Sequence, residues 1–320
     1  MSCRWVVAVV SVIVMMTACG DSQMKPRSKG KPFSVVVTGE DTRLRNMVAK
    51  TIGDVEVDRL PQREKAYQVN TIATGEQSPE VKYARVAVVV GVDNSLASPK
   101  IRYEKDVHAT PQMMVRLTVP SADEMVKGHA RIASALNALI GRFETNVQLR
   151  HLRKAHSPAR EKEVERATGV TMLIPADIAK TKKSNGFIWL SDDGGTTMRN
   201  ICVYVAKGTD CSAERLLKVR DSVMQRNVKG EADSMYMTTV RNVAPLARVI
   251  DHGGRRIVEM RGLWEMKGDA MGGPFVSHTL TDSLNNRIVT AEAFVYAPGE
   301  KKRDVMKRLE AALFTVKIMK

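Results

Sequence analysis

Residues 256–296 read RIVEMRGLWEMKGDAMGGPFVSHTLTDSLNNRIVTAEAFVY, and this stretch decides the fold class. It contains three successive strand patterns, Arg256–Trp264, Phe275–Thr281 and Arg287–Tyr296, with no helical pattern between them. Turn residues separate the strands, and Asn285-Asn286 marks the last connection. Consecutive strands joined by short turns pair in antiparallel fashion. The stretch therefore predicts an antiparallel sheet.

Single helices punctuate the strands on either side of this stretch. The chain ends in an amphipathic pattern over Glu300–Val316, and Ser121-Ala122-Asp123-Glu124 is a capping box that opens a long helix to His156. Three further helical patterns cover residues 41–52, 158–168 and 212–228. Regular strand–helix alternation is missing. We therefore predict an α+β fold with mainly antiparallel sheets and roughly five amphipathic helices.

Four segments follow from composition and pattern. They are a signal peptide (residues 1–18), a flexible polar tether (19–32), an N-terminal α+β half (33–156) and a C-terminal α+β half (157–320). Each half holds several strands and finishes on an amphipathic helix. This arrangement leaves open whether the halves are similar and descend from a duplication.

The N-terminus has the order of a secretory signal. Arg4 precedes an apolar run, Trp5–Met16, that is too short for a permanent membrane span. Met16-Thr17-Ala18-Cys19 then resembles a bacterial lipobox, which implies acylation of Cys19 with chains such as palmitate. The alternatives are an ordinary cleaved signal and a retained anchor. The interpretation favours a lipoprotein attached to a membrane of the cell envelope, with its body facing the periplasm or the exterior.

The chain is basic, with a formal net charge of +15. Such a surface suits anionic lipid, acidic glycan or nucleic acid, but the basic residues are scattered, which is typical of a solvated surface. Export argues against nucleic-acid partners. After loss of the signal only Trp189 and Trp264 remain of three tryptophans, which disfavours a glycan receptor. An unknown envelope protein or an anionic surface component is the expected partner.

Two cysteines, Cys202 and Cys211, remain in the predicted body. An exported compartment permits a disulfide between them, although so short a loop would have to turn back on itself. Two separate thiols are the alternative. No histidine clusters with them, so they predict no zinc site, and we expect neither a metal nor a cofactor.

Several segments resemble a known family. They include Arg220-Asp221-Ser222-Val223-Met224, Arg261-Gly262-Leu263-Trp264, and Met266–His278 with the sequence MKGDAMGGPFVSH. In the first half, Asp106–Met113 also fits. These segments resemble Bacteroidota lipoproteins grouped as the domain of unknown function numbered 4837. The resemblance implies an exported lipoprotein, with the outer membrane favoured over the inner, and it carries no catalytic residues.

Met266–His278 is the best candidate site in the sequence. Asp269 and His278 could form an acid–base pair if the turn brought them together, and Lys267 could hold an anion. The glycines Gly268, Gly272 and Gly273 allow close backbone approach and positive φ. The competing interpretation is a plain connection between two strands.

Known catalytic signatures are missing from the sequence. It has no Gly-x-Ser-x-Gly elbow and no His-x-x-x-His pair. We therefore expect a non-enzymatic envelope lipoprotein that binds a partner or supports assembly. The alternative is a hydrolase that acts on an envelope polymer or lipid through Asp269 and His278.

Overall fold

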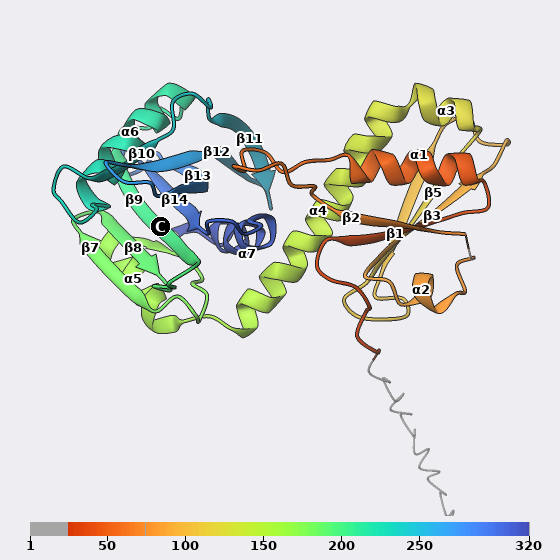
Figure 1. The fold of residues 1–320 in the computed structure, drawn as a ribbon, viewed down its shortest axis with the longest axis horizontal. Coiled ribbons are helices and arrows are strands. Elements are labelled where there is room, and N and C mark those ends of the chain that lie inside the picture. Colours follow the sequence, from red (N-terminus) through yellow and green to blue (C-terminus); the bar gives the residue numbers. More distant parts are fainter. Residues whose placement is uncertain (1–24, 74, 320) are drawn as a thin grey trace, which may run out of the picture.

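The computed structural model describes residues 25–73 and 75–319, which form two halves connected by one long helix (Figure 1). Residues 1–24, with the predicted signal peptide and Cys19, lie outside the described residues. Within the described ranges, no helix is both long and apolar enough to cross a membrane.

The N-terminal half is built on a five-stranded sheet in the order β2-β1-β3-β5-β4. Its elements are β1 (Ser34–Thr38), α1 (Thr42–Gly53), β2 (Gln68–Ile72), α2 (Pro79–Lys82), β3 (Val86–Val92), β4 (Lys100–Lys105), β5 (Met113–Val119), α3 (Ala122–Lys127) and α4 (His129–Lys154). The β1–β2, β1–β3 and β3–β5 pairs are parallel, and β4 runs antiparallel to β5. Helices α1, α3 and α4 cover one face and α2 lies on the other (Figure 1).

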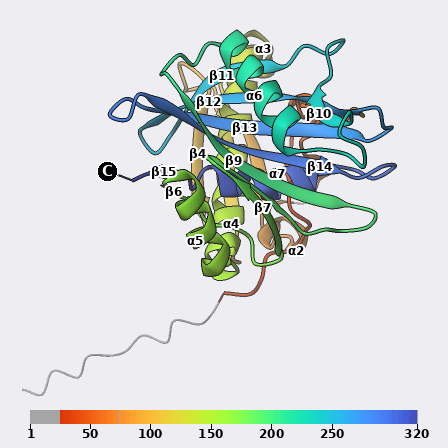
Figure 2. The same ribbon diagram turned by 90° about the vertical axis from the view of Figure 1, so that its left-hand side faces the viewer.

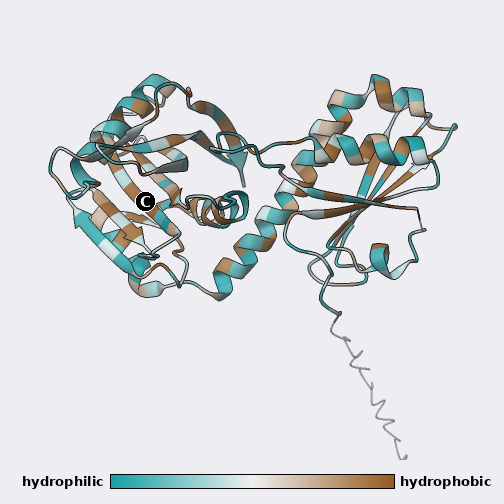
Figure 3. Ribbon diagram, viewed as in Figure 1, coloured by the Kyte–Doolittle hydropathy of each residue, from teal (hydrophilic) through white to brown (hydrophobic). Residues whose placement is uncertain are grey.

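The C-terminal half is built on an eight-stranded antiparallel sheet in the order β10-β12-β13-β14-β9-β8-β7, with β11 also pairing β12. Its elements are α5 (Pro158–Thr168), β6 (Val170–Thr171), β7 (Lys180–Ser184), β8 (Phe187–Ser191), β9 (Met198–Lys207), α6 (Ala213–Asn227), β10 (Tyr236–Thr239), β11 (Leu246–His252), β12 (Arg255–Lys267), β13 (Gly272–Asp282), β14 (Arg287–Tyr296), α7 (Arg303–Leu313) and β15 (Lys317–Ile318). One apolar core lies under α6 and another under α5 and α7. Figure 2 shows these helices against the sheet, and Figure 3 shows hydrophobic residues along its strands. This sheet is therefore covered on both faces.

The predicted α+β class with mostly antiparallel sheets is confirmed, with a correction to the number of helices. The two halves are not similar, because one sheet is mainly parallel and the other antiparallel. The described residues form seven helices rather than five. The short α2 carries no long periodic pattern, and the single helix predicted over Ser121–His156 is two helices that meet at Gly128. The Ser121 hydroxyl accepts from the Glu124 N–H at 3.2 Å, as the capping box predicts.

Part of the segment predicted as a flexible tether, residues 19–32, is hydrogen-bonded to the N-terminal half, and residues 19–24 lie outside the described residues. The Thr110 N–H donates to the Pro26 carbonyl at 2.9 Å, and the Lys29 N–H donates to the Tyr83 carbonyl at 2.7 Å. The Arg85 N–H in turn donates to the Lys29 carbonyl at 3.0 Å. Backbone hydrogen bonds thus fix residues 26–29 to the N-terminal half, before the position of Phe33 where the sequence suggested that order begins.

Contacts from both halves hold the molecule together. Helix α4 places Ile132 and Val147 in the core of the N-terminal half and Leu152 in the core of the C-terminal half. Helix α7 has no side-chain cap of its own, and the Glu64 carboxylate of the other half takes this role. It accepts from the Lys302 and Arg303 N–H groups at 2.7 and 3.1 Å. This cap positions α7, and with it one face of the C-terminal sheet.

Candidate functional site

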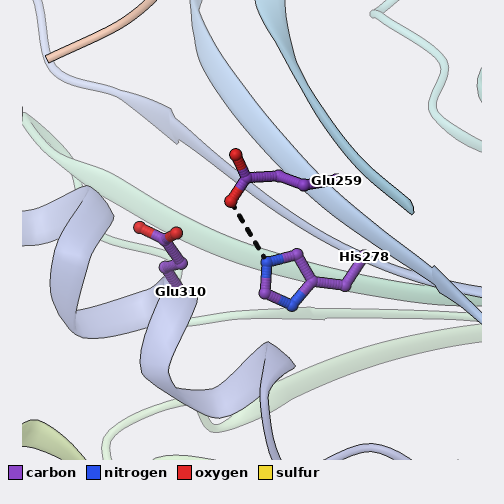
Figure 4. Close-up of side chains that lie close together, drawn as sticks. All are labelled: Glu259, His278 and Glu310. Carbon is purple, nitrogen blue, oxygen red and sulfur yellow. Dashed lines mark ion pairs between the residues drawn. The ribbon is translucent and has the colours of Figure 1, made fainter. Parts of the chain in front are cut away.

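Three ionisable side chains converge on the α7 face of the C-terminal sheet. Glu259 and His278 are cross-strand neighbours on β12 and β13, and Glu310 points toward them from α7 (Figure 4). One ligand-type atom of each residue lies within 4.8 Å of the others, and all three residues are buried. Two carboxylates and an imidazole form a donor set that suits divalent metal ions.

Basic side chains already neutralise these carboxylates. Arg261 donates to Glu259 at 2.9 and 3.0 Å and also bonds Glu310. Arg248 contacts Glu259 at 2.7 Å, and Lys307 contacts Glu310 at 3.1 Å. Three cations therefore face two carboxylates, and a metal would have to displace Arg261. The residues present do not fit a metal centre.

The electrostatics of the cluster stabilise its charged forms. Burial alone would raise the pKa of Glu259, but the His278 ring and the Arg261 guanidinium hold it well below its usual range. Burial also opposes ionisation of Glu310, whose pKa is nevertheless lowered by Arg261 and Lys307. Burial likewise opposes the charge on Arg261, and its two glutamate partners raise its pKa. This cluster is an ion-paired part of the core.

His278 packs within this core rather than at a surface. Its Nε2 lies 3.6 Å from the nearer Glu259 oxygen, which exceeds hydrogen-bond distance, and the ring meets Phe314 edge-on at 4.5 Å between centroids. Phe314 in turn contacts His252 at 4.3 Å. Among the described residues, neither ring nitrogen of His278 has a hydrogen-bond partner.

The proposed Asp269–His278 acid–base pair is wrong. Asp269 is exposed in the turn after β12, where it accepts from the Ala270 N–H at 2.6 Å. His278 lies six residues along β13 from Gly272, roughly 20 Å away at the rise of an extended strand. Lys267 is also exposed and contacts the Tyr236 hydroxyl at 3.1 Å. The turn therefore brings neither Asp269 nor Lys267 to His278.

The three glycines of this segment have different roles. Gly268 has φ of +85°, as a tight turn requires. Gly272 and Gly273 belong to β13, and close packing explains them instead of positive φ. A Cβ at Gly272 would lie 2.9 Å from the Trp264 carbonyl oxygen, and one at Gly273 would run into the Val295 carbonyl. These glycines are structural.

Sequence reasoning missed a second buried cluster, on the α6 face. Arg220 of α6 donates to Glu292 of β14 at 2.7, 2.9 and 3.1 Å and to the Thr239 hydroxyl at 2.8 Å. Its guanidinium also lies 3.8 Å from the centre of the Phe275 ring. Burial would lower the pKa of Arg220, but Glu292 raises it, while burial raises the pKa of Glu292 itself. Arg220 follows Leu216 by four residues, so helical spacing could have placed it on the inward face.

The two thiols of the C-terminal half are free. Cys202 is buried on β9, and burial raises its pKa well above the usual thiol value. Cys211 lies half-buried before α6, with its sulfur 3.3 Å from the Thr281 hydroxyl. Of the two alternatives, the structure thus shows separate thiols.

A groove of about 1000 Å³ lies beside the N-terminal end of α6. Its lining includes residues of the loop before α6 and of strands β11, β12 and β13, among them Cys211, Ser212, Val249, Arg256, Val258, Thr279 and Thr281. No carboxylate lines it, and Val249 is 55% exposed. Two of its basic residues have other contacts, since Arg248 pairs with Glu259 and Arg255 donates to the Phe314 and Val316 carbonyls. The groove is thus an open, partly apolar surface with a basic margin.

Comparison with known proteins assigns the two halves to two families. Residues 157–315 belong to the family described as Domain of unknown function (DUF4837). Residues 28–153 match a different model, Domain of unknown function (DUF8532). The family resemblance drawn from the C-terminal motifs is therefore confirmed, whereas Asp106–Met113 falls under the second model. No curated protein matches the chain.

Several solved structures share local similarity with this chain. A crystal structure from Bacteroides thetaiotaomicron is 14% identical with a TM-score of 0.28, and the match covers 47% of this chain and 45% of that one. The Saccharomyces cerevisiae Ran-binding protein Mog1p is 10% identical with a TM-score of 0.32, covering 47% and 89%. The human StarD13 lipid transfer and protein localization domain is 10% identical with a TM-score of 0.22, covering 49% and 90%. Such weak likenesses carry no argument about function.

Proposed function

We propose that this protein is a lipid-anchored, non-enzymatic binding protein of the cell envelope. Its body faces the periplasm or the exterior, with the outer membrane favoured, and a partner binds in the groove between α6 and β11. The groove is the main support for a binding role. It is lined by strands of the C-terminal sheet and includes the exposed apolar side chain of Val249.

The ionisable cluster supports binding over catalysis. A hydrolase needs an acid and a base that reach substrate, but Glu259, His278 and Glu310 are closed in by α7 and tied up by three basic side chains. The groove contains the free thiol of Cys211, but no histidine lines it to act as the base that a catalytic cysteine needs. These features support a recognition surface on a rigid scaffold.

The anchor is tested by Cys19→Ala, with Cys202→Ala as a control that leaves the lipobox intact. We expect wild type and the control in the membrane fraction and Cys19→Ala in the soluble fraction. Unchanged membrane association of Cys19→Ala would refute the lipid anchor.

The groove is tested by crosslinking pull-down of the lipidated protein from its own envelope. Val249→Arg places a charge in the groove, and Val126→Arg is matched because Val126 is 54% exposed but lies on α3 of the other half. We expect the first variant to lose a crosslinked partner that wild type and the second variant retain. Equal recovery from both variants would contradict a binding role for the groove.

A further inference from the structure

A second hollow, of about 410 Å³, lies in the N-terminal half where the predicted tether meets the body. Five basic side chains line it, and no carboxylate does. They are Arg27, Arg85, Arg150, His151 and Lys154. Such a concentration of one charge differs from the scattered basic residues of the rest of the chain.

Three separate segments supply these side chains. Arg27 precedes β1, and Arg85 comes directly before β3. The other three follow Val147 on α4 at spacings of three, four and seven residues, which places them on one helical face. Because Arg27 and Arg85 are not on the helix, compensation of the α4 dipole does not explain the cluster.

The charge of the hollow is only partly neutralised. Arg85 pairs with buried Glu144 at 2.7 and 2.8 Å, and Arg150 is 3.7 Å from Asp106. Arg27 and Lys154 make no ion pair within residues 25–73 and 75–319. Burial, followed by the charges of Arg85, Arg150, Arg27 and Lys154, lowers the pKa of His151. The hollow therefore carries a net positive charge.

We propose that this hollow binds a phosphate group, carried by a membrane lipid headgroup or by a soluble phosphate. Guanidinium and ammonium groups from several directions are the usual donors to phosphate oxygens. Arg27 lies eight positions after Cys19, so a fully extended chain between them spans at most roughly 30 Å. A lipid headgroup as the ligand rests on the proposed anchor, because only an anchored body stays this close to headgroups. The phosphate site itself does not depend on the anchor.

The test uses the full-length mature chain carrying Cys19→Ala, so that no acyl chain contributes to binding. The probes are inorganic phosphate, vesicles of phosphatidylglycerol and phosphatidylcholine, and vesicles of phosphatidylcholine alone. Arg27→Gln/Lys154→Gln removes two charges from the hollow. Arg131→Gln/Lys301→Gln removes two exposed charges elsewhere and is the matched control.

We expect the hollow variant to lose roughly tenfold or more in affinity and the control to keep it, because each lost contact is charge-assisted. Binding to anionic vesicles without binding to inorganic phosphate identifies the lipid headgroup, and binding to inorganic phosphate identifies a soluble ligand. Equal losses in both variants, or no binding to any probe, would overturn the proposal.

The imidazole signal of His151 gives a second readout by NMR. A bound phosphate offsets the nearby positive charges, so the pKa of His151 should rise on binding. Circular dichroism confirms that the variants are folded. Because the protein is unlipidated and the groove is untouched, failure here leaves the proposed function standing, and failure of the groove or anchor tests leaves this site standing.

Discussion

Arg220 and Arg261 each bring a guanidinium into the interior of the C-terminal half, on opposite faces of one sheet. Moving a charge out of water costs free energy, and the attraction within an ion pair offsets this cost only if the geometry of the pair is good. Glu292 meets that condition for Arg220 through three contacts. The pair therefore fixes how α6 sits on β14 more than it adds net stability.

Loss of one partner should be far more damaging than loss of an exposed pair. We predict that Glu292→Gln lowers the free energy of unfolding by about 3–5 kcal/mol, because buried Arg220 loses its hydrogen-bonded counter-charge and keeps only Asp221 at 3.6 Å. Glu214→Gln breaks an exposed pair with Lys218 on the same α6 and should cost under about 0.5 kcal/mol. Urea denaturation measures both. Similar small losses in the two variants would contradict the structural role of Glu292.

A substitution at Gly273 can test how tightly β13 packs within the segment Met266–His278, which was the candidate site in the sequence. We predict that Gly273→Ala lowers the free energy of unfolding by about 1–3 kcal/mol, because the new methyl group runs into the Val295 carbonyl. At Gly195 a Cβ meets nothing within 4 Å, so Gly195→Ala should stay within about 0.5 kcal/mol of wild type. Thermal or urea denaturation decides, and equal stability of the two variants would refute the packing argument.

At the scale of elements, α7 begins on a cap supplied by the other half. We predict that Glu64→Ala destabilises the protein by about 1–2 kcal/mol, because the Lys302 and Arg303 N–H groups lose their acceptor. Hydrogen exchange at these two amides should accelerate. Glu231→Ala, at an exposed position, serves as the control and should change neither property. Unaltered exchange in Glu64→Ala would show that α7 does not depend on this contact.

Local signals predicted the helices well. Helix α5 spans Pro158–Thr168 and ends at Gly169 with φ of +69°, as its terminal residues indicate. The patterns over 41–52 and 212–228 also begin at the observed N-caps of α1 and α6, Asp41 and Ser212. Short-range chemistry decides such boundaries, so one sequence is enough to find them.

Pairing between distant segments was harder to predict. The sequences of β7 and β11 are polar or irregular and show no clear strand pattern. Each is a strand because a neighbour pairs with it, β8 with β7 and β12 with β11. The same limit applies to the candidate site. His278 was found in the sequence, but its neighbours Glu259 and Glu310 are set by strand register and by the docking of α7. Proximity in sequence favoured Asp269, and the extended geometry of β13 separates it from His278.

At the scale of the whole molecule, stability should fall in mild acid. Burial, then the charges of Arg255 and His278, lower the pKa of His252. The unfolded chain therefore binds a proton near pH 6.5 that the folded protein resists, so the stabilising effect of neutral His252 is lost as pH falls below about 6.5. We predict that His252→Gln has a shallower loss of stability between about pH 7 and 5 than wild type. An unchanged slope in urea titrations at several pH values would contradict this assignment.

The described molecule presents two candidate binding surfaces, one on each half. The basic hollow lies at the start of the described chain in the N-terminal half, and the groove lies on the C-terminal half. The bond from the Lys302 N–H to Glu64 is one of the contacts that join the two halves. Figure 1 shows the described chain beginning on the side of the N-terminal half where α2 lies, away from β11. We therefore expect the membrane and the partner to be engaged by different halves.

Site-specific photocrosslinking in the native envelope can capture a partner that occupies the groove. A photoreactive amino acid at Val249 samples the groove, and one at Val126 samples a surface of equal exposure on the other half. We predict a discrete adduct from position 249 that is absent from position 126 and is lost when Arg256→Glu reverses the charge at the margin of the groove. No adduct at position 249, or the same adducts from both positions, would contradict it.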